Sequence, residues 1–304
     1  MLYAAKFGSS TYEKEIVLAL KNNEIISEPH KNIANFSEIS QFDGRRSFTL
    51  GESWLYIQIF GIFENPNSFL KNSLFKFVLE LKEKKIVEKF HYLRYYDIGE
   101  PSLRVRFRLS DSNEKENFIN LVSRLSEWSI SNIKMSKMTK IFYGTYEREL
   151  ERYGGIGFIE YAETIFDIDS TVCLKNILTI TDELLIYSGI ELLVCLGMEY
   201  LEQRVCFFSR YDKKAQREVY RSLRNNLDFL LISEIFDGKN FFYKDFSDKF
   251  KEISKKLNDC SNREYIAFSI LHIHFNRLLV NNEKESQVMA IIRHILKDLE
   301  YKRL

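Results

Sequence analysis

Apolar residues recur along this chain with two different periods, and the change between them divides it near its middle. In the first half, short runs with every second residue apolar, typical of strands, alternate with longer runs of helical period. These periods predict strands at 54–60, 90–96, 103–109 and 133–146, and helices at 65–85 and 111–128. The order strand–helix–strand–strand–helix–strand indicates a split βαβ, or ferredoxin-like, arrangement.

After residue 155 the pattern is helical to the end of the chain. Helices are predicted at 155–166, 170–177, 184–200, 213–230, 241–257, 265–280 and 283–301, with Asp169-Ser170 as the cap of the second. The expected fold class is therefore α+β, a ferredoxin-like four-stranded antiparallel sheet followed by an all-helical region. We expect a lead-in segment at 1–50, the sheet domain at 51–153 and the helical region at 154–304, which would complete an active site.

The segment from Tyr146 to Gly155, Tyr-Glu-Arg-Glu-Leu-Glu-Arg-Tyr-Gly-Gly, joins the two halves and concentrates charge. A strand that hands over to a helix exposes side chains at its end and free backbone N–H groups at the helix start. One interpretation is therefore a site that binds a carboxylate. The other is a solvated strand end followed by a glycine turn.

Composition and charge exclude several classes of protein. The chain has 304 residues with 44 Lys+Arg against 43 Asp+Glu, so no global charge favours a nucleic-acid or membrane surface. We expect no signal peptide, and the sequence has no apolar run long enough to span a membrane. Its four cysteines are widely spaced, which argues against metal or disulfide use. We expect a cytoplasmic protein that uses no metal and no cofactor and that binds neither membranes nor, directly, nucleic acid.

Arg104, Arg106 and Arg108 alternate along the third predicted strand and so share one face of the sheet. Arginine binds carboxylates and phosphates through two parallel hydrogen bonds, which lysine cannot do. Arg94 on the neighbouring strand extends the group. The pattern favours an anion site slightly over an ordinary solvent-facing sheet surface.

His272 and Asn276 share one face of a predicted helix, four residues apart. Histidine is the usual proton carrier near neutral pH. His274 points about 200° away from His272, so the two form a poor metal pair. The alternative interpretation is a buried histidine hydrogen-bonded to asparagine.

Together these motifs resemble the C-terminal domain of class I lantibiotic dehydratases. The same module occurs alone as the thiopeptide-type bacteriocin biosynthesis protein. The resemblance runs from about residue 51 to the end, and the most specific motifs are Glu-Arg-Tyr-Gly-Gly at 151–155 and His-x-His-x-Asn-Arg-Leu at 272–278.

The resemblance implies a lyase of lanthipeptide or thiopeptide biosynthesis. Ser or Thr of a ribosomally made precursor peptide is first glutamylated by a separate, tRNA-dependent protein. The module found here then eliminates glutamate and leaves dehydroalanine or dehydrobutyrine. Its partners would be the precursor peptide and the glutamylation protein, and a homo-oligomer stays open.

The resemblance also assigns residues. Arg104 and Arg106 would bind the glutamyl group, either Arg148 or Arg152 would be the third arginine, and His272 would carry the proton. The remaining residues assigned to substrate binding are Arg108, Tyr153, Asn276 and Arg277.

Two alternatives stay open. Some standalone relatives join two dehydroalanines in a formal aza-Diels–Alder cycloaddition that makes a thiopeptide pyridine. They are expected to lose the glutamate-binding arginines, which this chain retains. The third hypothesis is a non-catalytic subunit that binds the leader peptide.

Overall fold

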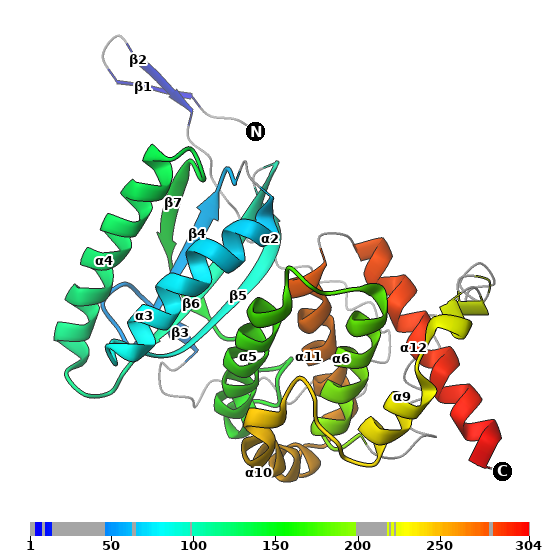
Figure 1. Ribbon diagram of the computed structural model, residues 1–304. Helices are drawn as coiled ribbons and strands as arrows, with labels where there is room; N and C mark the ends of the chain where they lie inside the picture. Colours follow the sequence, from blue (N-terminus) through cyan, green and yellow to red (C-terminus); the bar gives the residue numbers. More distant parts are fainter. Residues whose placement is uncertain are drawn as a thin grey trace. The chain divides into compact units, whose positions relative to one another are not determined.

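The computed structural model describes residues 4–7, 10–13, 46–62, 65–97, 99–198, 218, 220–221, 223–279 and 282–303 (Figure 1). Residues 1–34 form one unit and residues 35–304 a second, compact one. In the first unit, β1 (Ala4–Phe7) pairs antiparallel with β2 (Ser10–Glu13). Most of the predicted lead-in, Cys206 and the start of the helix predicted at 213–230 lie outside the described residues.

The second unit begins with a four-stranded antiparallel sheet. Its strands are β4 (Trp54–Phe60), β5 (Val87–Asp97), β6 (Glu100–Leu109) and β7 (Lys140–Gly144), in the order β5-β6-β4-β7. Register places His91 opposite Arg106, and Arg106 opposite Tyr56. The fourth strand is shorter than the predicted 133–146, because α4 (Glu114–Lys134) continues through Ile133. A β-branched residue late in a helix was therefore mistaken for the start of a strand.

Two helical runs pack against one face of this sheet (Figure 1). The first comprises α2 (Pro66–Phe69), the π-helical turn η1 (Leu70–Leu74) and α3 (Phe75–Glu83), and the second is α4. Pro66 occupies the first turn, where its missing N–H costs nothing, and the Asn65 side chain caps Asn67. The side chains of Val105 and Phe107 are buried between sheet and helices, so the arginines of β6 face the other way.

The rest of the described chain is helical apart from its connections. It contains α5 (Ile156–Asn176), α6 (Asp182–Cys195), η3 (Arg224–Asn226), α9 (Phe229–Phe236), η4 (Lys244–Phe246), α10 (Ser247–Asn258), α11 (Arg263–Leu278) and α12 (Asn282–Arg303). These helices enclose a second hydrophobic core that runs from Leu150 to Leu296. No helix in the described ranges combines the length and apolarity needed to cross a bilayer.

The predicted helix start at Asp169-Ser170 was wrong, because α5 runs unbroken through both residues. Asp169 is fully buried and its carboxylate bonds to His274 and Arg277 rather than to backbone N–H groups of its own helix. Sequence shows the capping residue type but not the tertiary partners that occupy it.

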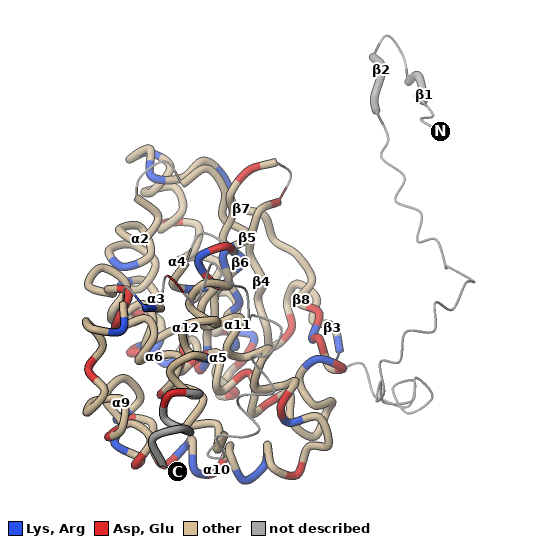
Figure 2. Tube along the Cα trace, turned by 90° about the vertical axis from the view of Figure 1, so that its right-hand side faces the viewer, with Lys and Arg blue, Asp and Glu red and all other residues tan. Residues whose placement is uncertain are grey.

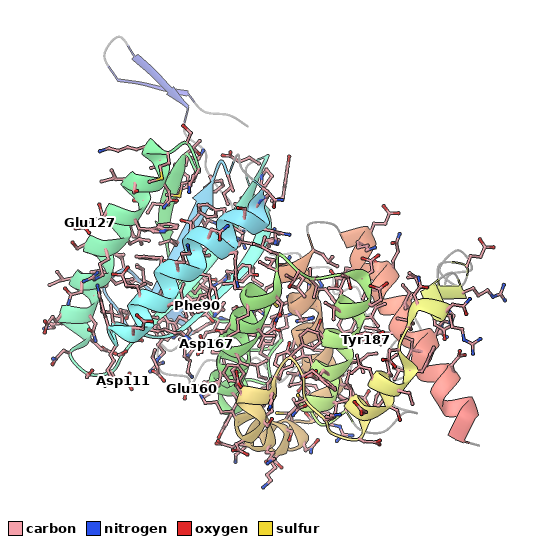
Figure 3. All side chains as sticks on the ribbon, in the orientation of Figure 1. Phe90, Asp111, Glu127, Glu160, Asp167 and Tyr187 are labelled. Atoms are coloured by element: carbon pink, nitrogen blue, oxygen red, sulfur yellow. The ribbon has the colours of Figure 1, made fainter. Side chains whose placement is uncertain are left out.

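Side chains from α5 and α11 bond to the backbone of β5, which is an edge strand. The Asn276 amide accepts from the Arg94 N–H and donates to the Arg94 C=O, both at 2.9 Å. Arg277 donates to the Tyr92 C=O, and the Phe90 N–H donates to Asp167 at 3.0 Å (Figure 3). The two helices are thereby fixed beside the sheet face that carries His91 and Arg106.

Candidate functional site

A small cleft opens where the face of β5 and β6 meets α5, α11 and the segment after β8 (Tyr146–Glu147), which pairs with β3 (Ser47–Phe48). Its volume is about 30 Å³. The polar residues that line it are His91, Arg106, Tyr146, Glu147, Glu149, Tyr153 and Arg277. The cleft therefore joins the sheet, the charged junction and the helical half.

Arg106 is the arginine of β6 that lines this cleft. Its Nε and Nη1 atoms are buried and have no hydrogen-bond partner in the described part of the chain. Its guanidinium lies 4.9 Å from the ring centre of Tyr56 and 5.2 Å from that of Tyr146. Burial lowers the pKa of Arg106 from its usual value. This guanidinium is available to an anion that enters the cleft.

The other two arginines of the strand already have acidic partners. Arg104 bonds to Asp97 at 2.7 Å and stacks 3.4 Å from the ring centre of Tyr95. Arg108 pairs with Glu88 and Asp111 at the far end of the strand. Neither of them lines the cleft. The three arginines share one face of the sheet, but their surroundings differ.

Arg148 and Arg152 also differ. The Arg148 guanidinium makes two hydrogen bonds of 2.7 Å to Glu163 on α5, and both side chains are at most 3% exposed. Arg152 is 32% exposed and bonds at 3.1 Å to Glu149, which lines the cleft. Of the two, Arg152 lies where a substrate can reach it.

The two glycines of the junction make its turn. Gly154 has φ of +78°, and a Cβ there would lie 2.8 Å from Phe158 and 2.9 Å from Ile266. Only glycine combines this conformation with so close an approach. The turn starts α5 and directs Tyr153 into the cleft wall.

The motif at 272–278 contributes side chains with separate environments. His272 Nδ1 lies 2.6 Å from Glu285 Oε1 of α12, and 39% of the His272 side chain is exposed. Asn276 bonds to β5 as described above, and Arg277 lines the cleft. The structure therefore brings Arg106, Tyr153 and Arg277 together. It leaves six of the predicted site residues outside the cleft lining: Arg104, Arg108, Arg148, Arg152, His272 and Asn276.

His91 is a cleft residue that the sequence did not single out. It is 3% exposed, and its ring packs edge-on against Trp54, Tyr146 and Phe166. Burial, and then the charges of Arg106 and Arg277, lower the pKa of His91 well below its usual value. The sequence offered one indication that His91 belongs to the site: it lies on the predicted strand next to the one that carries Arg106.

A buried polar cluster behind Arg277 was also missed. Asp169 Oδ1 lies 2.8 Å from His274 Nδ1 and accepts a 2.6 Å hydrogen bond from the Tyr243 hydroxyl, while Asp169 Oδ2 bonds to Arg277. His274 Nε2 lies 3.0 Å from Ser188 Oγ. The loop that carries Tyr243 is held by Glu191, which accepts from three successive backbone N–H groups.

This cluster resembles a metal site in its donor atoms. Ligand atoms of Asp169, Cys173 and His274 lie within 4.8 Å of one another and are buried. However, the positive charge of Arg277 already neutralises Asp169, and hydrogen bonds satisfy both carboxylate oxygens. The arrangement holds the Arg277 guanidinium in place and needs no metal ion to balance the Asp169 charge.

Asp169 should make the free energy of unfolding depend on pH in the acidic range. Burial alone would raise the pKa of the Asp169 carboxyl, but His274 and Arg277 hold it well below its usual range. An unfolded aspartate titrates near ~3.9. The carboxylate therefore stabilises the fold above about pH 4, and this contribution falls away as pH decreases further. In denaturant unfolding between pH 7 and 3, Asp169→Asn should show a flatter acid limb than the wild type, and an unchanged slope would contradict this.

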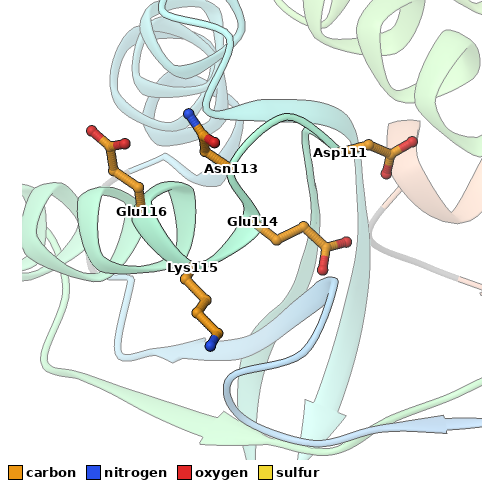
Figure 4. Close-up of a pocket in the computed structure, with 5 residues that line it drawn as sticks. All are labelled: Asp111, Asn113, Glu114, Lys115 and Glu116. Atoms are coloured by element: carbon orange, nitrogen blue, oxygen red, sulfur yellow. The ribbon is translucent and has the colours of Figure 1, made fainter.

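A second hollow lies at the start of α4 and is lined by Asp111, Asn113, Glu114, Lys115 and Glu116 (Figure 4). Its side chains are exposed and point in different directions. Acidic and basic residues are interspersed along the described chain, as Figure 2 shows. Because the side chains of this second hollow do not converge, the cleft at Arg106 is the better candidate for a functional site.

Comparison with known sequences gives a consistent result. The profile of the family described as lantibiotic biosynthesis dehydratase C-term matches residues 54–297. The subtilin biosynthesis protein SpaB of Bacillus subtilis is 26% identical over 98% of this chain and 30% of its own length. The nisin biosynthesis protein NisB of Lactococcus lactis subsp. lactis is 27% identical over 82% of this chain and 26% of its own length. The chain thus spans under a third of these relatives.

Solved structures share the fold. The tRNA-dependent lantibiotic dehydratase MibB from Microbispora sp. 107891 superposes with a TM-score of 0.65 at 19% identity, over 84% of this chain and 29% of MibB. The pyridine synthase TbtD from thiomuracin biosynthesis gives a TM-score of 0.52 at 9% identity, over 82% of this chain and 99% of TbtD.

Proposed function

The chain belongs to the lantibiotic biosynthesis dehydratase C-terminal family, and on this premise we propose that it eliminates glutamate from glutamylated Ser or Thr of a ribosomally made precursor peptide. The product is dehydroalanine or dehydrobutyrine. A separate, tRNA-dependent protein supplies the glutamylated peptide, and the reaction takes place in the cytoplasm. The strand order supports a ferredoxin-like sheet domain at 51–153 that shares the site with the helical region at 154–304.

The reaction breaks two bonds and forms one double bond. A base takes the proton from the peptide Cα, and the electron pair left behind forms the Cα=Cβ bond. The Cβ–O bond breaks, and glutamate leaves as a carboxylate. A peptide Cα is weakly acidic, so positive charge near the developing anion matters as much as the base.

The observation that carries this proposal is the unpaired guanidinium of Arg106. A buried arginine normally has an acidic or carbonyl partner, and Arg106 has none within the described residues. A bound glutamyl carboxylate would complete its hydrogen bonding. Arg152, whose partner Glu149 lines the cleft, is the third arginine of the proposed site.

His272 lies outside the cleft lining but is partly exposed on α11, the helix that also carries Arg277, and it is the proposed proton carrier. Its contact with Glu285 at Nδ1 would fix the ring and leave Nε2 for the substrate, as in other histidine–carboxylate pairs. Replacement His272→Ala is expected to lower the elimination rate by about 100-fold or more. Glu285→Gln should lower the rate less, with binding unchanged. Rates measured on glutamylated peptide would test both, and an unchanged rate in His272→Ala across neutral pH would remove it from the mechanism.

The test of the function uses a synthetic peptide that carries a glutamyl ester on one serine. Mass spectrometry should show a product lighter than the substrate by glutamic acid. A protein that leaves this peptide intact but consumes an already dehydrated one would be a cyclase. A protein that only binds peptide would be the leader-binding subunit, and either outcome would overturn the proposal.

A further inference from the structure

We propose that the inner end of the cleft is a carboxylate pocket, built by Arg277 and His91 together with Arg106, that binds the side-chain carboxylate of the glutamyl group and selects glutamyl over glutaminyl esters. The inference rests on the proposed function. To the proposed function it adds how the glutamyl group is oriented and which residues bind its side chain.

Three nitrogen-bearing side chains in this region have unused hydrogen-bonding capacity. Arg277 is fully buried, and its Nη2 atom has no hydrogen-bond partner among the described residues, although Nε and Nη1 bond to Tyr92 and Asp169. The buried Nδ1 atom of His91 and the Nε and Nη1 atoms of Arg106 are in the same condition. Buried polar groups are rarely left unpaired, so their gathering around one cleft indicates a missing acceptor.

The charge at this inner end favours an anion. Arg106 and Arg277 bring two guanidiniums, and the Asp169 carboxylate that balances Arg277 lies behind it and outside the cleft lining. Because burial and both arginines lower the pKa of His91, its ring is neutral at neutral pH and offers a hydrogen bond without a further charge.

The size of the cleft and the charges at its mouth determine how the glutamyl group is oriented in it. The cleft is small, about 30 Å³, and partly open, so one end of a glutamyl group can enter it while the rest lies toward the mouth. The acids of the lining, Glu147 and Glu149, are exposed and therefore lie at the mouth. A glutamyl group esterified through its α-carboxyl has its side-chain carboxylate farthest from the ester. The carboxylate would enter first, and the ammonium would meet the acids at the mouth, next to the ester and the peptide.

The first test compares two peptides that differ only in the acyl group, one with a glutamyl and one with a glutaminyl ester. The wild type should eliminate from the glutamyl ester at least ~100 times more efficiently in kcat/KM, as expected when an amide replaces a paired carboxylate. Arg277→Gln should lose most of this preference, and His91→Leu should lose part of it. Arg124 of α4 pairs with Glu80 of α3 on the surface, so Arg124→Gln is the matched control. Equal efficiency for the two esters in the wild type would overturn the inference.

A binding measurement separates this inference from the function. Trp54 lies 5.6 Å from the ring of His91, and Trp128→Phe leaves it as the only tryptophan. L-Glutamate should change the Trp54 fluorescence at concentrations at least ~10 times lower than L-glutamine, and His91→Leu should reduce this difference. Glutamate selectivity without any elimination would support the pocket and overturn the function. Elimination with equal responses to glutamate and glutamine would do the reverse. His91→Leu removes no hydrogen bond of the described structure, so it stays informative if Arg277→Gln fails to fold.

Discussion

Replacing Arg106 with alanine is expected to leave a folded protein that accumulates glutamylated peptide and forms dehydrated product ~100 to 1,000 times more slowly. Arg106 has no acidic partner within the described chain, so its removal breaks no ion pair. The same replacement takes away a guanidinium that binds the glutamyl group in the proposed site. The loss should therefore appear mainly in the rate, with only a small fall in thermal stability from the lost contacts with Tyr56 and Tyr146.

Time courses by mass spectrometry, with circular dichroism on the same samples, would measure both quantities. Arg106→Lys keeps the charge but loses the two-pronged geometry, so it should recover only a small part of the rate. Arg124→Ala provides the surface control. Normal amounts of dehydrated product from Arg106→Ala would remove Arg106 from the site.

The second large effect is expected for replacement of Arg148, which should lower the stability of the fold. Its two hydrogen bonds to Glu163 are buried, and the Tyr146 hydroxyl donates to the same carboxylate at 3.0 Å. Arg148→Met would leave the Glu163 charge buried without its cation, which costs about 3–5 kcal/mol. For a chain of this size the midpoint of thermal unfolding should fall by roughly 10 °C.

The double variant Arg148→Met/Glu163→Leu distinguishes the ion pair from packing. It removes both charges together, so it should recover most of the lost stability. Arg152→Met, which breaks a partly exposed pair, should change the midpoint by less than ~2 °C. Thermal scans of the three variants would decide. If the double variant unfolds as early as Arg148→Met, the loss comes from packing and not from an uncompensated charge.

The alternation of β6 predicted which residues face the core, because a strand allows only two directions for its side chains. The same rule could not say which arginine lacks a partner. Asp97 and Glu88, which pair with Arg104 and Arg108, come from β5, and their reach depends on register.

The junction shows a similar limit. Arg148 and Arg152 look equivalent along the chain, but Glu163 lies fifteen residues beyond Arg148 on a helix whose direction depends on the Gly154 turn. His91 lies in the middle of β5, where three successive residues are buried and no alternation marks one face. These features depend on the packing of α5 and α11 against the sheet, which no local pattern encodes.

The side chains that α5 and α11 extend to β5 have a consequence for association. An edge strand with free N–H and C=O groups is a template on which another chain can polymerise. At β5 these groups are occupied at Phe90, Tyr92 and Arg94 by Asp167, Arg277 and Asn276. The opposite edge, β7, has no such cover among the described residues. Strand addition to β5 is therefore blocked at these three positions.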